Sequence, residues 1–443
     1  MQSALEISKT KSQTKILLVG DDMRSFLACA RSYGRQGFEV HAAPFNWAAP
    51  ALFSKYVQQV HKLPRQGLDV NLWVTAVRDL QAVEHFDLIV PCDERALLPL
   101  CAVPTNQRNF RLADPGPRAL EMLFDKARTR ELAHQLGVPI AKGETIDQNS
   151  DAKALVEKYG LPLMLKARSS YSIEELETRG QVYVVPSQDE LAFRLDCLPS
   201  AGQYLLESFF PAAGAADGVG LSVAARKGKI LSAFQHRRLV EKPGGGSSSV
   251  RISEPIDAGM YDAVEKMCAA TKLNGIAMFE FRQSVTTGEW VLLEVNARPW
   301  GSMPLPLALG IDFPMMFADI HLDVKRAYAT DYKSGVVGKN LVLTLLHKLQ
   351  GRGRANVGVI VSALNETIIH SVNCIRAKEV SDSFVFDDLK PAIFEFSALL
   401  RRGFDRILWQ RKGRPERRHG VVVPQTMAQS SSVDIPKDRK QAS

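Results

Sequence analysis

The stretch Gly275–Gly301 constrains the fold of this chain more than any other, because it predicts a hairpin with facing charges. Its sequence is GIAMFEFRQSVTTGEWVLLEVNARPWG, in which two apolar runs flank a TTG turn. Glu280 and Glu294 each lie seven residues from Thr287. A hairpin centred on that threonine therefore places the two carboxylates directly opposite each other on one face.

The two faces of this hairpin differ in polarity. Asn296 lies two residues beyond the second glutamate and shares its face, while the opposite face pairs Phe279 with Val295 and Phe281 with Leu293. Facing carboxylates repel each other unless a cation lies between them. Two carboxylates and an amide offer the oxygen ligands that Mg²⁺ or Mn²⁺ prefers, so we expect a metal site here.

A simpler interpretation makes these side chains solvated acids on the outer face of a two-layer sheet. An outer face, however, does not need an acid, an acid and an amide at mirrored spacing. Arg298, Pro299 and Gly301 follow the set directly, which also favours a functional site.

The first part of the chain predicts a doubly wound α/β domain, which we place at residues 15–115. Lys15–Gly20 and Glu39–Ala43 are expected strands separated by a helix that ends near Gly37, and Phe86–Pro91 is a further buried strand. The first turn, GDDMRS, is not GxGxxG. We therefore expect no dinucleotide there, and a structural domain that walls a substrate cleft is the better interpretation.

The middle of the chain predicts an α+β region. Asp125 is a candidate N-cap for a helix that ends at Gly137, and a second helix is expected at Ala152–Tyr159. The expected strands, most of them joined by Gly-containing turns, are Leu161–Ala167, Gln181–Val185, Tyr204–Phe209, Leu221–Arg226, Ile230–His236, Ile276–Phe281 and Trp290–Val295.

Taken in order, these segments resemble the ATP-grasp superfamily, which includes biotin carboxylase, carbamoyl-phosphate synthetase and D-alanine ligase. The resemblance rests on DKARTRELAHQLGVP, LPLMLKA, YLLESFF and the ExN of the hairpin. It implies an α/β and α+β protein. Its expected parts are an N-terminal pre-ATP-grasp domain (15–115), an ATP-grasp domain (116–325) with a lid subdomain (about 126–203), a C-terminal helical extension (326–423) and a disordered basic tail (424–443).

The resemblance also implies cofactors, ATP and Mg²⁺, and roles for individual residues. Lys126 and Lys166 correspond to the two nucleotide-binding lysines of the superfamily. Glu207 and the backbone of Phe209 correspond to the hinge over which adenine lies. The residues implied to hold the magnesium ions are Glu280, Glu294 and Asn296.

Physical arguments treat the two lysines differently. Lys166 ends an apolar strand, a position that packing explains poorly and an anionic ligand explains well. Lys126 lies at a helix start, where its positive charge opposes the helix dipole unless a phosphate binds both the lysine and the free N–H groups. Without the resemblance, a solvated helix residue is the simpler interpretation of Lys126.

The loop after the second lysine departs from the superfamily. Arg168–Ile173 lacks the glycines usual in a phosphate-covering loop, and the next glycine is Gly180. Arg168 and the serine hydroxyls could still hold phosphate. A second loop, Glu241–Ser249 (EKPGGGSSS), resembles a segment of ATP-grasp proteins of unassigned substrate and is a candidate replacement, although a flexible connection fits it equally well.

The resemblance implies a ligase that transfers the γ-phosphoryl group of ATP to a small carboxylate, so that an amine or another nucleophile can displace phosphate. Arg298 would offset the developing charge, and His236 or Arg237 would orient the carboxylate, although a basic pair at a strand end is often only a solvated edge. The alternative is a nucleotide-binding scaffold without catalysis. The glycine-poor loop favours this alternative, and the intact metal set opposes it.

The net charge of +8 is concentrated at the C-terminus. Arg401–Ser443 holds eleven Lys and Arg against four acids, a surplus of seven, which leaves about +1 on the first 400 residues. Nucleic-acid binding by the body of the protein is therefore disfavoured. An apolar stripe in a helix expected at Pro391–Trp409 predicts either attachment to an anionic membrane or an acidic partner, or packing onto the body, which is the commoner outcome.

The remaining composition bounds the cellular context. The six cysteines are scattered, without a CxxC pair or a histidine at zinc-ligand spacing, so we expect neither a disulfide framework nor structural zinc. No apolar run reaches the roughly 20 residues of a membrane span, and the first residues lack the apolar stretch of a signal peptide. We therefore expect a cytoplasmic protein. The sequence names neither the acid, nor the nucleophile, nor the oligomeric state.

Overall fold

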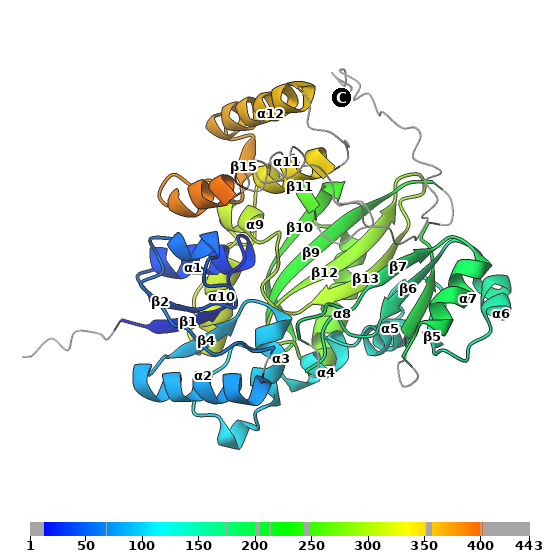
Figure 1. Cartoon of the computed structure of the whole chain (residues 1–443), viewed down its shortest axis with the longest axis horizontal. Coiled ribbons are helices and arrows are strands. Elements are labelled where there is room, and N and C mark those ends of the chain that lie inside the picture. Colours follow the sequence, from blue (N-terminus) through cyan, green and yellow to red (C-terminus); the bar gives the residue numbers. More distant parts are fainter. Residues whose placement is uncertain are drawn as a thin grey trace, which may run out of the picture. The chain divides into compact units, whose positions relative to one another are not determined.

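Short strands and helices alternate through the first hundred residues. They are β1 (Lys15–Val19), α1 (Ser25–Arg35), β2 (Glu39–Ala43), η1 (Pro50–Phe53), β3 (Gln59–Val60), α2 (Val70–Glu84), β4 (Leu88–Pro91), α3 (Glu94–Ala102) and η2 (Thr105–Gln107). The strands form a parallel sheet in the order β3-β2-β1-β4. Ile16 and Leu18 pack with α1 on one face, and Leu17 and Val19 pack with α2 and α3 on the other, so the predicted doubly wound arrangement is confirmed (Figure 1).

The computed structural model describes residues 13–67, 69–173, 176–199, 204–211, 214–241, 248–350, 357–398 and 401. Residues up to Ala398 belong to one unit, and Leu399–Ser443 to a second unit, of which only Arg401 is described. The predicted tail at 424–443 and the second half of the helix predicted at Pro391–Trp409 therefore lie outside the described residues.

A seven-stranded sheet contains the predicted hairpin, in the order β13-β12-β9-β10-β11-β14-β15. All its strand pairs are antiparallel except β14 with β15. The strands are β9 (Ala216–Arg226), β10 (Lys229–Glu241), β11 (Ser248–Glu254), β12 (Gly275–Ser284), β13 (Trp290–Asn296), β14 (Val337–Lys339) and β15 (Glu379–Ser381).

Helices cover both faces of this sheet, because apolar side chains point to both sides of its central strands. Leu221 and Phe279 pack against one group of helices, which are α4 (Pro117–Leu123), α5 (Lys126–Gln135) and α8 (Ala258–Thr271). Ala224 and Ile276 pack on the other face against α10 (Phe313–His321).

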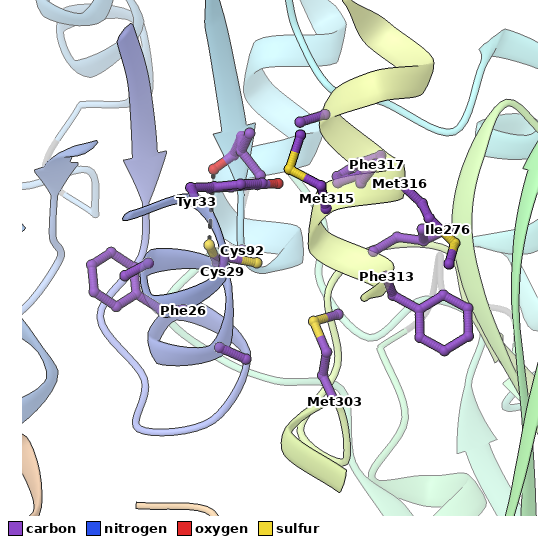
Figure 2. Close-up of a cluster of buried hydrophobic side chains, with 14 of the residues drawn as sticks. Phe26, Cys29, Tyr33, Cys92, Ile276, Met303, Phe313, Met315, Met316 and Phe317 are labelled. Atoms are coloured by element: carbon purple, nitrogen blue, oxygen red, sulfur yellow. Dashed lines mark hydrogen bonds between the residues drawn. The ribbon is translucent and has the colours of Figure 1, made fainter. Parts of the chain in front are cut away.

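Helix α10 also packs on α1, and this contact joins the N-terminal sheet to the large sheet. Figure 2 shows Phe26, Cys29 and Tyr33 of α1 in one cluster with Phe313 and Met315 of α10. All five side chains are buried. Each large apolar side chain buried in this way contributes roughly 1.5–3 kcal/mol, so the cluster holds the two sheets firmly together.

A smaller antiparallel sheet lies beside the hairpin, in the order β5-β8-β6-β7. Its elements are β5 (Gly143–Ile146), α6 (Ala152–Tyr159), β6 (Leu163–Ala167), β7 (Val182–Val185), α7 (Gln188–Asp196) and β8 (Tyr204–Ser208). Leu163 and Leu165 are buried against α6 and α7, so alternation leaves Met164 and Lys166 on the other face. This sheet falls largely within the predicted lid subdomain, and the domain boundaries stay a prediction.

The chain after the large sheet's hairpin is mostly helical, as expected for a C-terminal extension. Its described helices are α9 (Pro304–Ala308), α10, α11 (Leu341–Gln350), α12 (Val357–Ile375) and a helical segment at 390–398. Arg251 pairs with Asp382, and both side chains are fully buried. None of the described helices combines the length and the hydrophobicity that a membrane crossing requires.

A buried ion pair ties the C-terminal segment to α1. Arg31 Nε donates to Asp388 Oδ2 at 2.9 Å, and both side chains are almost completely buried. The same carboxylate accepts from Ser54 Oγ at 2.7 Å and from the Lys55 N–H at 3.0 Å. Arg35 and Asp387 form a neighbouring pair that is more than a third exposed.

We predict that Asp388→Asn lowers the free energy of unfolding by about 3 kcal/mol, because it leaves the Arg31 charge buried without its counter-ion. The matched control, Asp387→Asn, removes a solvent-screened pair and should cost less than about 1 kcal/mol. Guanidinium-induced unfolding of both variants measures the difference. Equal losses would show that the buried pair has no special role in stability.

Candidate functional site

The hairpin pairs its two glutamates as the sequence predicted. Glu280 lies directly across from Glu294, and Phe279 lies across from Val295. The predicted pair of Phe281 with Leu293 is wrong, because the register shifts by one residue after Glu280 and Phe281 pairs with Leu292. This β-bulge turns Leu293 onto the face that carries the carboxylates.

Asn296 and a neighbouring arginine satisfy the two carboxylates. Asn296 Nδ2 donates to Glu280 Oε1 at 3.1 Å and to Glu294 Oε1 at 3.4 Å. Arg238 Nη2 lies 2.5 Å from Glu280 Oε2. Burial raises the pKa of Glu280, although Arg238 opposes this. Burial would also raise the pKa of Glu294, but the cations of Lys126 and Lys166 lower it.

A cavity of about 710 Å³ lies between the small sheet and the hairpin. Six of the eleven predicted site residues line it, and they come from α5, β6, the end of β8, β12 and β13. These six are Lys126, Lys166, Glu207, Phe209, Glu280 and Glu294. The remaining five, which do not line it, are Arg168, His236, Arg237, Asn296 and Arg298.

The two lysines that line the cavity come from different elements. Lys166 is buried near the end of β6 and pairs with the Glu207 carboxylate, which also accepts from Arg130 Nη1 at 3.0 Å. Lys126 begins α5, half-buried rather than fully solvated, and its Nζ donates to Ser170 Oγ at 3.3 Å. Burial lowers the pKa of Lys126, although Glu294 opposes this.

The start of α5 and the loop after β6 are joined to each other. The Asp125 side chain caps the helix, as predicted, by accepting from the Ala127 and Arg128 N–H groups. It also pairs with Arg168, whose backbone carbonyl accepts from the Lys126 N–H at 2.8 Å. Arg168 therefore holds the loop against the helix and is not among the residues that line the cavity, and its predicted role on phosphate stays a prediction.

At the predicted hinge, the Phe209 N–H and the Glu207 carboxylate both have hydrogen-bond partners within the protein. The Phe209 N–H already donates to the Pro162 carbonyl at 3.2 Å, as a continuation of the β6–β8 ladder. The Glu207 carboxylate is engaged by Lys166 and Arg130. Both residues line the cavity, and these groups already have partners within the protein.

Arg298 connects the hairpin to the N-terminal sheet. Its guanidinium donates to Glu94 Oε1 at 2.9 Å from Nη2 and at 3.2 Å from Nε, and Nη2 also donates to Asn296 Oδ1 at 3.0 Å. Burial opposes the charge of Arg298, but Glu94 holds the pKa of this group above its usual range. Glu94 begins α3, directly after β4, and no local sequence signal paired it with the hairpin.

Alternation along β10 decides which of its basic residues reaches the cavity. His236 and Arg238 share one face, and Arg238 lines the cavity. Arg237 lies on the opposite face, where it pairs with Glu254 at 2.6 Å and with Asp217 at 3.1 Å. Arg237 therefore does not line this cavity, and its predicted role on the substrate carboxylate stays a prediction. A strict period of two from His236 would have selected Arg238.

The His236 side chain is buried in the large sheet. Its register neighbour on β9 is Gly220, and a Cβ there would lie 2.3 Å from the imidazole, so only glycine leaves room for the ring. Gly220 also pairs with Glu280 on its other side. Among the described residues, nothing accepts from or donates to His236 Nε2. Most of the candidate loop Glu241–Ser249, at residues 242–247, lies outside the described residues.

The charges of the cavity favour an anionic ligand. Its lining holds five cationic side chains against three carboxylates, a net charge of +2. The small sheet contributes apolar side chains to the same wall as Lys166, namely Met164, Val182 and Val184. A cavity with an apolar surface, several cations and two facing carboxylates can hold a planar apolar group beside phosphates and a divalent metal.

Comparisons with curated proteins reach only part of the chain. No family model matches it. The carbamoyl phosphate synthase large chain of Deinococcus radiodurans is 26% identical over 209 residues, which cover 44% of this chain and 20% of that protein. The chain spans no more than a fifth of the length of the curated relatives that it matches.

Solved structures are similar over most of the chain. The biotin carboxylase domain of a 2-oxoglutarate carboxylase from Hydrogenobacter thermophilus, solved with MgADP, ADP and bicarbonate, has a TM-score of 0.58 at 18% identity and covers 73% of each chain. N5-carboxyaminoimidazole synthetase from Staphylococcus aureus, solved with ADP, has a TM-score of 0.56 at 14% identity over 76% of this chain and 86% of that one. The chain therefore has the ATP-grasp fold that the sequence resemblance implied.

We predict that His236 makes the protein less stable in mild acid. Burial, with Arg238 and Arg251 nearby, holds the pKa of His236 well below its ordinary value. The unfolded chain therefore binds a proton below about pH 6.5 that the folded chain does not, and stability falls as the pH drops below that value. Between pH 7.5 and 5.5 this residue alone should cost about 1 kcal/mol of unfolding free energy.

The variant His236→Gln should lose this contribution and show a flatter stability profile over that range. His134→Gln, which changes an exposed histidine on α5, should keep the wild-type profile. Urea unfolding at several pH values measures each curve. A slope in His236→Gln that matches the wild type would contradict a buried neutral imidazole.

Proposed function

We propose that this protein is an ATP- and Mg²⁺-dependent ligase, which activates a small carboxylate as an acylphosphate for attack by an amine or another nucleophile. The observation that carries the proposal is the cavity between the two sheets, which brings Glu280 and Glu294 together with Lys126 and Lys166. Two facing carboxylates and two lysines in one cavity match the needs of a metal–nucleotide complex.

The hairpin fits a magnesium site. Glu280 and Glu294 are a cross-strand pair whose repulsion is offset by Asn296 Nδ2 and by Arg238. The same carboxylates, with the Asn296 amide oxygen, would hold Mg²⁺. Bound Mg²⁺ would supply neutralisation of phosphate charge.

The rest of the cavity fits a nucleotide. Val182 and Val184 are each 47% exposed on β7, so an apolar surface is open for a base. Lys126 and Lys166 would bind phosphates, and the net positive charge of the lining favours an anion. Both similar solved structures contain ADP, which agrees with this assignment.

The protein would position the reacting groups and neutralise their negative charge, and no side chain of the protein would act as a covalent nucleophile. A carboxylate oxygen of the substrate takes the γ-phosphoryl group as its bond to ADP breaks. The nucleophile then attacks the acyl carbon, and phosphate leaves with the electron pair. Arg238 lines the cavity and would offset the charge on the transferred group. Arg298 donates to the Asn296 amide oxygen and would hold this side chain in position.

The alternative is a nucleotide-binding scaffold without catalysis. The pairing of Arg168 with Asp125 favours it, because this arginine is then committed to the protein rather than to phosphate. The proposed cytoplasmic location stays a prediction. Attachment of the basic segment to a membrane or an acidic partner also stays a prediction, since Arg401–Ser443 lies almost entirely outside the described residues.

We expect phosphate release from ATP to require one particular carboxylic acid and one particular nucleophile together. A screen of acids against amines and other nucleophiles, at saturating Mg²⁺, measures this requirement and identifies both reactants. Nucleotide binding with no turnover in any combination would instead support the scaffold.

We predict that Glu294→Gln lowers Mg²⁺-dependent turnover by about 100-fold or more, because it removes a charged ligand at nearly constant volume. The matched control is Glu289→Gln, which changes an exposed glutamate in the turn of the same hairpin and should leave turnover unchanged. Turnover is measured at limiting Mg²⁺, with circular dichroism to check the fold. Wild-type turnover in Glu294→Gln would remove the metal site from the hairpin.

A further inference from the structure

A second group of metal-ligating side chains lies in the N-terminal sheet. His41 on β2, His61 directly after β3 and Glu84 at the end of α2 offer one ligand atom each, and these atoms lie within 4.8 Å of one another. It is the one such group of His, Cys, Asp and Glu among the described residues. His41 Nδ1 lies 2.8 Å from His61 Nε2. Three separate segments thus present two imidazoles and a carboxylate to one point.

The orientation of His41 is that of a metal ligand. Its Nε2 donates to Glu39 Oε1 at 2.8 Å, which directs the Nδ1 lone pair toward His61. Metal-binding histidines commonly donate their second N–H to a carboxylate in this way. The ring of Phe86 packs edge-on against both imidazoles, and His41 is buried. His41 is therefore fixed in place before any metal binds.

The charges around the group favour a dication. Glu39 and Glu84 contribute two negative charges, and Lys15 contributes one positive charge, since its Nζ pairs with Glu84 and lies 3.7 Å from Glu39. One net negative charge remains while the imidazoles are neutral.

We propose that His41 Nδ1, His61 Nε2 and a Glu84 oxygen bind a divalent transition-metal ion of the zinc class, with water as the fourth ligand. Two imidazoles and a carboxylate are a ligand set that suits zinc. In a tetrahedral shell with bonds of about 2.0–2.1 Å, the two ligand nitrogens lie roughly 3.3 Å apart. Metal binding would therefore move the partly exposed His61 slightly away from His41. The proton that these nitrogens share in the free protein passes to Nδ1 of His61.

This site is separate from the cavity. Lys15 and Glu39 begin β1 and β2, and Glu84 ends α2, so the group lies toward the amino ends of the parallel strands. Glu94, which contacts Arg298, follows the carboxyl end of β4. Ligands of such sheets usually bind at the carboxyl ends. The metal would therefore have a structural role and tie α2 to the β2–β3 edge of the sheet.

The test is a zinc titration of the tag-free full chain, by competition with a chromogenic chelator. Millimolar Mg²⁺ is present throughout so that the oxygen ligands of the hairpin are occupied. We expect one tight zinc ion per chain. His61→Ala and Glu84→Gln should each weaken it by about tenfold or more, since each removes a ligand. His134→Ala, which changes an exposed histidine outside the group, and Glu294→Gln should bind zinc as the wild type does.

Lys15→Gln gives a test of opposite sign. Removing this cation should strengthen zinc binding by about tenfold, because it relieves repulsion of a dication and frees Glu84. A misfolded variant cannot produce such a gain. The visible spectrum of the Co²⁺-loaded wild type should show a tetrahedral site. No tight zinc, equal affinity in wild type and His61→Ala, or weaker binding in Lys15→Gln would each overturn the proposal.

Discussion

Two carboxylates that face each other across β12 and β13 set the conditions that the surrounding structure meets. Glu280 is buried and Glu294 is half-buried, and such a pair of like charges is stable only if cations or hydrogen-bond donors compensate it. Compensation comes from several distant segments: Arg238 from β10, Lys126 from α5 and Asn296 from the hairpin itself. The arrangement of the large sheet, the small sheet and α5 is thus coupled electrostatically to one cross-strand pair.

This coupling extends into the N-terminal sheet through Arg298. That side chain links Asn296 to Glu94, which begins the helix after β4. The apolar cluster between α1 and α10 holds the same two parts together without charge (Figure 2). A polar contact and an apolar cluster therefore join the N-terminal sheet to the large sheet, whereas the small sheet contributes the wall of the cavity that carries Lys166.

Local sequence patterns predicted the bounds of several strands and helices correctly. β2 at Glu39–Ala43 and α6 at Ala152–Tyr159 have the predicted bounds, and Asp125 caps α5 as predicted. The features that local patterns missed depend on neighbouring strands. The β-bulge that displaces Leu293 has no local signal in the hairpin sequence, and the choice between the adjacent arginines of β10 depended on which face of that strand meets the cavity.

The sequence by itself determined the hairpin pair, the strand and helix types and the superfamily resemblance, because each depends on residues close together in the chain. Only the tertiary structure decided which side chains meet. It placed Arg238 rather than Arg237 in the cavity, and it brought His41 and His61 together in a sequence that showed no zinc-ligand spacing. The physical reason is that strand order and register join segments far apart in the chain, and this pairing depends on the packing of whole sheets rather than on local periodicity.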